Sequence, residues 1–194
     1  MTTALIVIDV QEEYFGGALP IQAPPREGSL ALITQAMDAA TAAGVPVIVV
    51  RHNGQPGEGS FEPGSPTWEL RPEIANRAHD ALIDKQLPGS FTGTPLQEVL
   101  SARGVDHLTI AGYMTNVCCD TTARQALHMG MGATILYDAV GVPAMPGVVG
   151  TLIDPHDLQR AALAPLALIG VEMSTTSNWV EGLGAEASWF DRLE

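Results

Sequence analysis

Short apolar runs rich in β-branched residues alternate along this chain with longer segments in which apolar residues recur every three or four positions. An unbroken apolar run is typical of a strand buried on both faces of a parallel sheet, whereas the wider spacing defines one face of a helix. The runs predict strands at residues 4–8, 45–50, 80–87, 108–111, 133–137 and 167–171. The helical spacing predicts helices at residues 30–43, 94–104, 115–130, 155–165 and 174–183.

Strands that alternate with helices six times predict an α/β fold with a single parallel sheet and helices on both of its faces. The 194 residues, of which 46% are hydrophobic, suffice for one sizeable core. We therefore predict a single domain that spans residues 1–194.

Charge and termini exclude several classes of partner. Nine basic and 22 acidic residues leave a net charge of −13, which repels nucleic acid and anionic membrane surfaces. The N-terminal segment has no basic region and only a short apolar core before Asp9, so it predicts neither a signal peptide nor a membrane anchor. Cys118 and Cys119 are adjacent, and their Cα atoms, about 3.8 Å apart, are too close for ordinary disulfide geometry. Free thiols fit a reducing compartment, and we predict a cytoplasmic protein.

The segment Ala111–Met129 carries both cysteines. A strand-like run there meets a turn and then helical spacing, which places Cys118 in the first turn of a predicted helix. Backbone N–H groups of a first turn carry partial positive charge, so a thiol there is expected to ionise more easily. Helical spacing groups Cys119 with apolar Ala123 and Cys118 with polar Thr122, which favours Cys118 as the thiol that faces a site. The alternative is that both cysteines are buried as small apolar side chains.

Two other reactive side chains lie at the ends of predicted strands. Asp9 ends the first run, and Lys85 lies near the end of the third. Because the carboxyl ends of parallel strands meet at one edge of the sheet, we expect Asp9, Lys85 and Cys118 to converge there. A lysine near a buried strand end requires a carboxylate partner, and Asp9 is the candidate. Taken singly, Asp9 could be a turn residue and Lys85 a solvated lysine.

Long loops follow the first two strands and are candidate walls of a pocket. His52 alone does not make a metal site, which needs three or four convergent donors, and no second histidine occurs before His79. We therefore predict no metal. His52 is either a hydrogen-bonded residue at a strand end or a substrate contact. The predicted substrate-binding residues are Phe15, His52, Phe61, Trp68 and Tyr113, although aromatic residues more often belong to the core.

Three motifs in this order resemble those of the isochorismatase-like cysteine hydrolases, a superfamily that includes nicotinamidase, N-carbamoylsarcosine amidohydrolase and isochorismatase. The motifs are Ile-Val-Ile-Asp-Val-Gln at 6–11, Asp-Lys at 84–85 with Ser90, Phe91 and Thr94, and Ala-Gly-Tyr-Met-Thr-Asn-Val-Cys at 111–118 followed by Thr-Ala-Arg at 122–124. The likeness extends over residues 3–172.

This resemblance implies a three-layer, Rossmann-like fold with a six-stranded parallel sheet. It implies a catalytic triad of Asp9, Lys85 and Cys118 that needs no cofactor. It also implies an oxyanion hole formed by the backbone N–H groups of Met114 and Cys118, with a cis peptide bond at Tyr113–Met114. The expected assembly is a homodimer or homotetramer, and the expected partner is a small-molecule substrate.

The resulting hypothesis is a metal-independent cysteine hydrolase that cleaves an amide-type C–N bond of a small molecule through a Cys118 thioester. The segment 51–53, Arg-His-Asn, lacks the Asp and His set that holds a metal in nicotinamidases, which argues against nicotinamide as substrate. One alternative is hydrolysis of a vinyl ether of the isochorismate type. A further alternative is a non-catalytic scaffold that binds a small molecule, since fold does not dictate function.

Overall fold

The protein is described by a computed structural model that places residues 2–57 and 59–189. Within these residues, seven strands form one sheet, in the order β2-β6-β5-β1-β3-β4, with β9 also paired to β6. All neighbouring pairs are parallel except β2 with β6. The strands of the sheet are β1 (Thr3–Ile8), β2 (Ile21–Ala23), β3 (Val47–His52), β4 (Ala81–Lys85), β5 (His107–Tyr113), β6 (Gly132–Pro143) and β9 (Glu172–Ser174).

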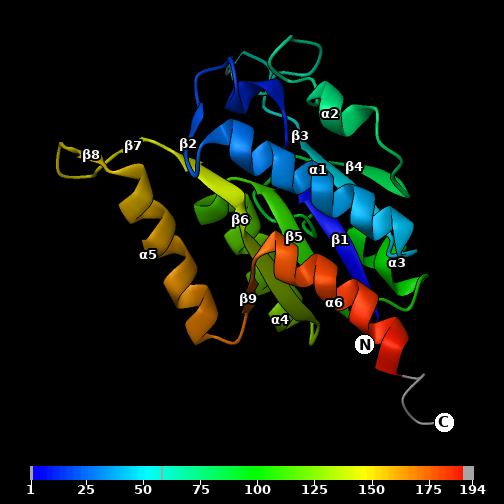
Figure 1. Cartoon of the computed structure of the whole chain (residues 1–194). Helices are drawn as coiled ribbons and strands as arrows, with labels where there is room; N and C mark the ends of the chain where they lie inside the picture. Colours follow the sequence, from blue (N-terminus) through cyan, green and yellow to red (C-terminus); the bar gives the residue numbers. More distant parts are fainter. Residues whose placement is uncertain (1, 58, 190–194) are drawn as a thin grey trace.

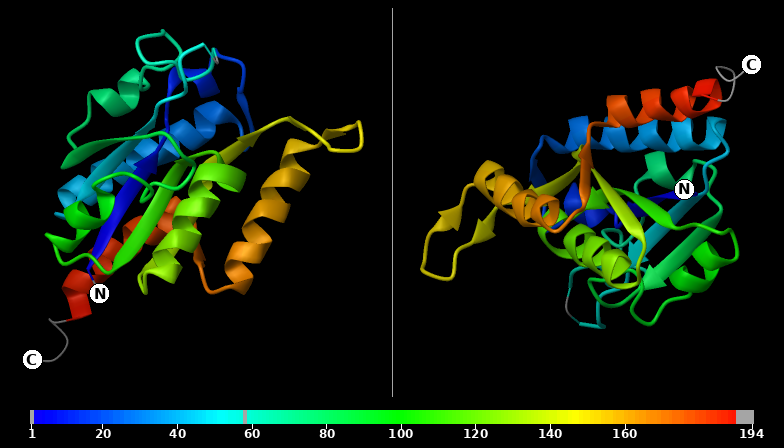
Figure 2. Two further views of the ribbon diagram at one scale, coloured as in Figure 1. Left: turned by 180° about the vertical axis from the view of Figure 1, so that it is seen from behind. Right: turned by 90° about the horizontal axis from the view of Figure 1, so that it is seen from below.

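Helices cover both faces of this sheet, so the fold has three layers (Figures 1 and 2). One face packs against α1 and α6, and the other against α3, α4 and α5. The helices are α1 (Arg26–Ala42), α2 (Pro72–Ala75), α3 (Leu96–Ser101), α4 (Asp120–His128), α5 (Pro155–Leu168) and α6 (Thr176–Trp189), with a 3-10 turn at Glu12–Tyr14 and a π-helical turn at Thr115–Cys119. The α/β class predicted from the alternating pattern is confirmed.

A seventh strand was not predicted. β2 lies within the segment 11–29, which the sequence indicates as a loop, and it runs antiparallel to the end of β6. Only Ile21 and Ala23 are buried in it, and two apolar positions are too few to produce a recognisable period.

The predicted strand at 167–171 is wrong. Helix α5 continues through Leu168, and Gly170, at a φ of +96°, follows its end. The alanine and leucine residues beyond Pro165 favour another helical turn, and a glycine with positive φ is a common helix terminator. The sixth parallel strand is instead β9, which pairs with β6 at residues 134–136.

Strand β6 also extends beyond its predicted end at Asp138. Its pairing with β5 shifts register between Ile135 and Val140, so that extra residues bulge from the ladder. The carboxylate of Asp138 accepts hydrogen bonds from the backbone N–H and the hydroxyl of Thr176, the first residue of α6. A residue typical of strand ends here caps a helix instead.

After β6 the chain forms a small hairpin, β7 (Met145–Pro146) and β8 (Leu152–Ile153), that extends away from the body of the molecule (Figure 1). Its tip carries the exposed apolar residues Val148 and Val149. In the part of the chain that the structure describes, no helix is long and apolar enough to cross a membrane.

Gly112 allows β5 to lie close to β1 at the carboxyl edge of the sheet. It pairs with Ile8 and has a φ of +109°. A Cβ atom at this position would lie 2.1 Å from the carbonyl oxygen of Ile8. Glycine at position 112 therefore allows the turn after β5 to lie beside Asp9, the residue that follows Ile8.

We predict that Gly112→Ala lowers the free energy of unfolding by about 3 kcal/mol or more, because both the backbone angle and the space are unsuitable for a side chain. Gly44→Ala is the matched control, since Gly44 also has a positive φ of +70° but has no atom within 4 Å of the added Cβ. That variant is expected to cost about 1 kcal/mol. Urea unfolding measures both values, and equal losses would contradict the close approach at Gly112.

Candidate active site

Three reactive side chains meet at the carboxyl edge of the sheet. Asp9 follows β1, Lys85 is the last residue of β4, and Cys118 lies in the π-helical turn after β5. The Nζ atom of Lys85 is 2.7 Å from Oδ2 of Asp9 and 3.3 Å from Sγ of Cys118. The side chains of Asp9 and Lys85 are completely buried, and Cys118 is 6% exposed. The structure thus brings together the three residues that the sequence places at separate strand ends.

The Lys85 ammonium has a third neighbour, Nδ1 of His52, at 3.2 Å. An ammonium group has three protons to donate and no lone pair to accept with, so the imidazole nitrogen is the acceptor. Donation to Nδ1 requires a neutral imidazole that carries its proton on Nε2. Lys85 thus has three polar neighbours: Asp9 in an ion pair, and Cys118 and His52 as hydrogen-bond acceptors.

Burial and charge set the protonation states of this cluster. Burial raises the pKa of the Cys118 thiol to about 12, and the negative charge of Asp9 acts in the same direction, against the opposing effect of Lys85. Burial works to lower the pKa of Lys85, but the negative charges of Asp9 and Cys118 outweigh it, and that pKa is raised. At neutral pH the cluster therefore holds an ammonium group and a protonated thiol.

The expectation that the helix start makes the thiol easier to ionise is wrong for this site. The partial charge of a helix terminus is smaller than the desolvation of a buried sulfur, and here a carboxylate is also close. For Cys118 to act as a nucleophile, a base would have to take its proton.

Cys119 belongs to the core, as helical spacing predicts. Its side chain is fully buried, in the same cluster as Ala123 and Ala126 of α4. Burial, together with the charge of Cys118, raises its pKa well above the ordinary value. Both cysteines are free of disulfide bonds.

Asp9 and Phe61 have backbone angles that are rare for residues with side chains, at φ values of +52° and +54°. Such angles cost free energy and often occur at functional sites. Neither carboxylate oxygen of Asp9 has a hydrogen-bond partner of regular geometry among the described residues, so the ion pair with Lys85 is its main contact. Asp9 thus retains lone pairs that can accept a proton.

The turn that carries Cys118 has the cis peptide bond at Tyr113–Met114 that the resemblance implies. The carbonyl oxygen of Met114 accepts hydrogen bonds from the N–H groups of Val117 and Cys119, at 3.3 and 3.1 Å. The oxyanion hole formed by the N–H groups of Met114 and Cys118 stays a prediction.

Hydrogen bonds between loops hold the cluster in place. The side chain of Gln11, which is fully buried, donates to the carbonyl oxygen of His52 and accepts from its N–H group. Ser90 and Thr122 join the loop after β4 to α4 through their hydroxyl groups, 2.9 Å apart. These residues belong to the motifs noted in the sequence, where their part in positioning could not be derived.

A group of buried aromatic rings lies beside the cluster. Tyr14 packs against Phe61 and Tyr113, with ring centroids 5.1 and 5.5 Å apart, and Phe61 packs edge-on against the His52 ring at 5.2 Å. Burial raises the pKa of Tyr14 well above its usual value, and the charges of Cys118 and Asp9 add to this effect. Sequence reasoning missed Tyr14. Its position five residues after Asp9, on a short turn, offered no periodic signal.

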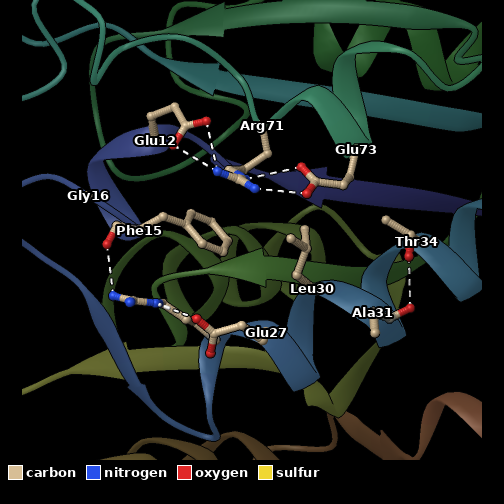
Figure 3. A pocket seen from close by; sticks show the side chains of 10 residues that line it. Glu12, Phe15, Gly16, Glu27, Leu30, Ala31, Thr34, Arg71 and Glu73 are labelled. Atoms are coloured by element: carbon tan, nitrogen blue, oxygen red, sulfur yellow. Dashed lines mark hydrogen bonds and ion pairs between the residues drawn. The ribbon is translucent and has the colours of Figure 1, made fainter.

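Phe15 lies on the wall of a neighbouring cavity of about 580 Å³ that the triad does not line (Figure 3). The guanidinium of Arg71 is 4.6 Å from the ring centroid of Phe15 and forms ion pairs with Glu12 and Glu73. The ring of Phe15 also contacts Tyr113, at 6.0 Å. Phe15 therefore supports the aromatic group from outside, and its role as a substrate contact stays a prediction.

The guanidinium carbon of Arg51 lies 3.8 Å from the ring centroid of Trp68. The Nε1–H group of Trp68 donates to Oδ1 of Asn53. These contacts hold the end of β3. A cavity of about 360 Å³ is lined by Lys85, Asn53, Asp84 and Thr92 among others, and Asp9 and Cys118 are not among its lining residues. Contact between Trp68 and a substrate stays a prediction.

No group of three or more His, Cys, Asp or Glu residues suited to hold a metal ion occurs among the residues that the structure places. The nitrogen of His52 that faces the cluster already accepts from a cation, Lys85. A second cation at that nitrogen would be repelled.

A buried thiol, carboxylate and ammonium thus lie together at the carboxyl edge of a three-layer α/β sheet, the edge at which open sheets of this kind bind ligands. Residues 3–178 match the model of the isochorismatase domain. The chain therefore belongs to the isochorismatase family of hydrolases.

Named relatives fit this assignment. The chain is 35% identical over 165 residues to the secreted isochorismatase effector Isc1 of Verticillium dahliae. This match covers 85% of this chain and 83% of the relative. It is 32% identical over 217 residues to a ureidoacrylate amidohydrolase of Methylobacterium radiotolerans. This match covers 95% of this chain and 78% of the relative. A crystal structure of a candidate isochorismatase from Burkholderia xenovorans superposes with a TM-score of 0.91 at 40% identity, over 94% of this chain and 88% of the other.

We predict that alkylation of Cys118 by iodoacetamide accelerates about tenfold with each pH unit between about pH 7 and pH 9.5, with no plateau. The thiolate is the reacting species, and a thiol with a pKa of about 12 gains thiolate throughout this range. Mass spectrometry of the Cys119→Ala variant measures the rate at Cys118 alone. A plateau that begins near neutral pH would show that the free protein already holds a thiolate.

Proposed function

We propose that this protein is a metal-independent cysteine hydrolase that cleaves an amide-type C–N bond of a small molecule through a thioester on Cys118. The observation that carries the proposal is the position of the Lys85 ammonium, which touches both the carboxylate of Asp9 and the sulfur of Cys118 in a buried cluster. The amidohydrolase relative supports the choice of a C–N bond.

In the first half of the reaction, Asp9 takes the proton of the thiol, and the thiolate of Cys118 attacks the carbonyl carbon of the substrate. Lys85 stabilises the negative charge that moves from Asp9 to sulfur. The backbone N–H groups of Met114 and Cys118 donate to the oxyanion. Asp9 then gives its proton to the departing nitrogen, and the C–N bond breaks to release an amine and leave a thioester.

In the second half, Asp9 takes a proton from a water molecule, which attacks the thioester carbonyl. The C–S bond breaks, the carboxylic acid leaves, and the proton returns to sulfur. The sum is amide plus water giving acid plus amine, with no other reactant. Thr115 Oγ1 and Asn116 Oδ1 are buried polar atoms without a partner among the described residues, and both lie in the turn that carries Cys118. They are available to hydrogen-bond a polar substrate or the water.

The similarity to an isochorismatase effector favours one second candidate, hydrolysis of a vinyl ether. That reaction releases a carbonyl compound and an alcohol, with no amine, and needs protonation of carbon in place of nucleophilic attack. The ion pair of Asp9 with Lys85, next to a thiol, suits the amide reaction better because it provides both a base and a nucleophile.

We predict that wild-type protein releases ammonia or an amine from at least one member of a panel of small amides, ureides and carbamoyl compounds, including ureidoacrylate and nicotinamide. Cys118→Ala removes the nucleophile and is expected to reduce kcat by about a thousandfold or more, whereas Cys119→Ala retains activity. The control assay uses isochorismate.

Mass spectrometry after acid quenching is expected to find the acyl group on Cys118. Amide hydrolysis that survives in Cys118→Ala would rule out covalent catalysis by this residue. Hydrolysis of isochorismate without amine release from the panel would favour the second candidate. The predicted homodimer or homotetramer is checked by light scattering on the same samples.

A further inference from the structure

We propose that His52 is a positioning residue that holds the catalytic ammonium of Lys85 through its Nδ1 atom. The inference rests on the proposed function, because it assigns His52 a part in keeping Lys85 between Asp9 and Cys118. It differs from a role as metal ligand or as direct substrate contact.

The backbone places His52 and Lys85 side by side. The two residues are paired in the register between β3 and β4, and each is the last residue of its strand. Their side chains therefore leave the sheet at the same level, and Nδ1 of His52 comes within 3.2 Å of Nζ. A lysine side chain has four rotatable bonds, so a buried ammonium without fixed acceptors has several positions available.

His52 is itself held on two sides. Gln11 accepts from its N–H group at 2.8 Å and donates to its carbonyl oxygen at 3.0 Å, which fixes the backbone relative to the strand end that carries Asp9. The ring of Phe61 packs edge-on against the imidazole, with an interplanar angle of 88°. An acceptor that is fixed in this way defines the direction of one N–H bond of the ammonium and, by tetrahedral geometry, restricts the other two.

The ammonium also forms the ion pair with Asp9, at 2.7 Å, and donates to the sulfur of Cys118, at 3.3 Å. When the proton moves from sulfur to Asp9, negative charge moves from one of these neighbours to the other. The neutral imidazole keeps the ammonium in place while its two charged neighbours exchange roles. Loss of Nδ1 would leave one proton of a buried ammonium without an acceptor and allow the group to turn.

Two substitutions separate the acceptor from the ring. His52→Asn keeps an acceptor oxygen near the position of Nδ1 and loses the ring that packs on Phe61. His52→Phe keeps a ring and loses the acceptor. With p-nitrophenyl acetate as the probe, we expect His52→Phe to lower kcat by about tenfold to a hundredfold with little change in KM, and His52→Asn to be at least about tenfold more active than His52→Phe.

If His52 served only in packing, His52→Phe would be more active than His52→Asn. That result would overturn the inference. Thermal unfolding checks that both variants fold. Nitrogen-15 NMR of the wild-type imidazole is independent of the variants and of catalysis: we expect the neutral form protonated on Nε2, with Nδ1 as an acceptor. A proton on Nδ1 would overturn the inference even if neither variant folds.

The two proposals fail in different ways. Transfer of the acetyl group to Cys118 in wild type, with equal rates in His52→Phe, would refute the role of His52 and leave the cysteine mechanism intact. Full activity in Cys118→Ala would refute the mechanism, whereas the NMR result would still report whether His52 accepts from Lys85.

Discussion

The buried positive charge of Lys85 is the constraint on which the arrangement of this site depends. A charged group that is completely removed from water is tolerated only when its neighbours compensate the lost hydration. Here the compensation comes from three segments: Asp9 after β1, His52 at the end of β3 and Cys118 after β5. The ends of three strands must therefore stay in register for the charge to remain buried. Adjacent strands lie about 4.8 Å apart, so the backbones of β4 and β1, separated by β3, are about 10 Å apart. A long side chain with its charge at the tip is required to bridge that distance.

In the proposed reaction, the same constraint allows a buried thiol to be stable in the free protein and to act as a nucleophile. Burial and the charge of Asp9 hold the pKa of Cys118 at about 12, so the sulfur remains protonated in the free protein. The ammonium that stabilises Asp9 also touches the sulfur, so transfer of the proton from sulfur to Asp9 moves the negative charge from one contact of Lys85 to the other. The total charge of the cluster does not change during this step. A proton transfer that conserves charge inside a low-dielectric site avoids the large cost of creating a new buried ion.

Much of this arrangement could be predicted from sequence because its signals are local. Apolar runs marked five of the six parallel strands; Asp9 and Cys118 follow such runs, and Lys85 lies near the end of one. Two features that were not predicted, β2 and the extension of β6, depend on tertiary contacts. β2 is a strand only because the end of β6 provides a partner, and the carboxylate of Asp138, in the bulged part of β6, accepts a hydrogen bond from Thr176 of α6. A single sequence contains neither fact.

The contacts that align the site were beyond prediction for a related reason. His52 next to Lys85 follows from the register of β3 and β4, and a pairing register cannot be read from either strand alone. Gln11 joins β1 to β3 through the backbone of His52, and the hydroxyl pair of Ser90 and Thr122 joins the loop after β4 to α4. Each of these bonds connects two of the segments that surround the ammonium. The strands bring the reactive groups to one edge of the sheet, but the distances of 2.7 to 3.3 Å around Lys85 depend on bonds between the loops that follow them. Substitutions of such loop residues are therefore expected to change the chemistry of Cys118 without contact with the sulfur.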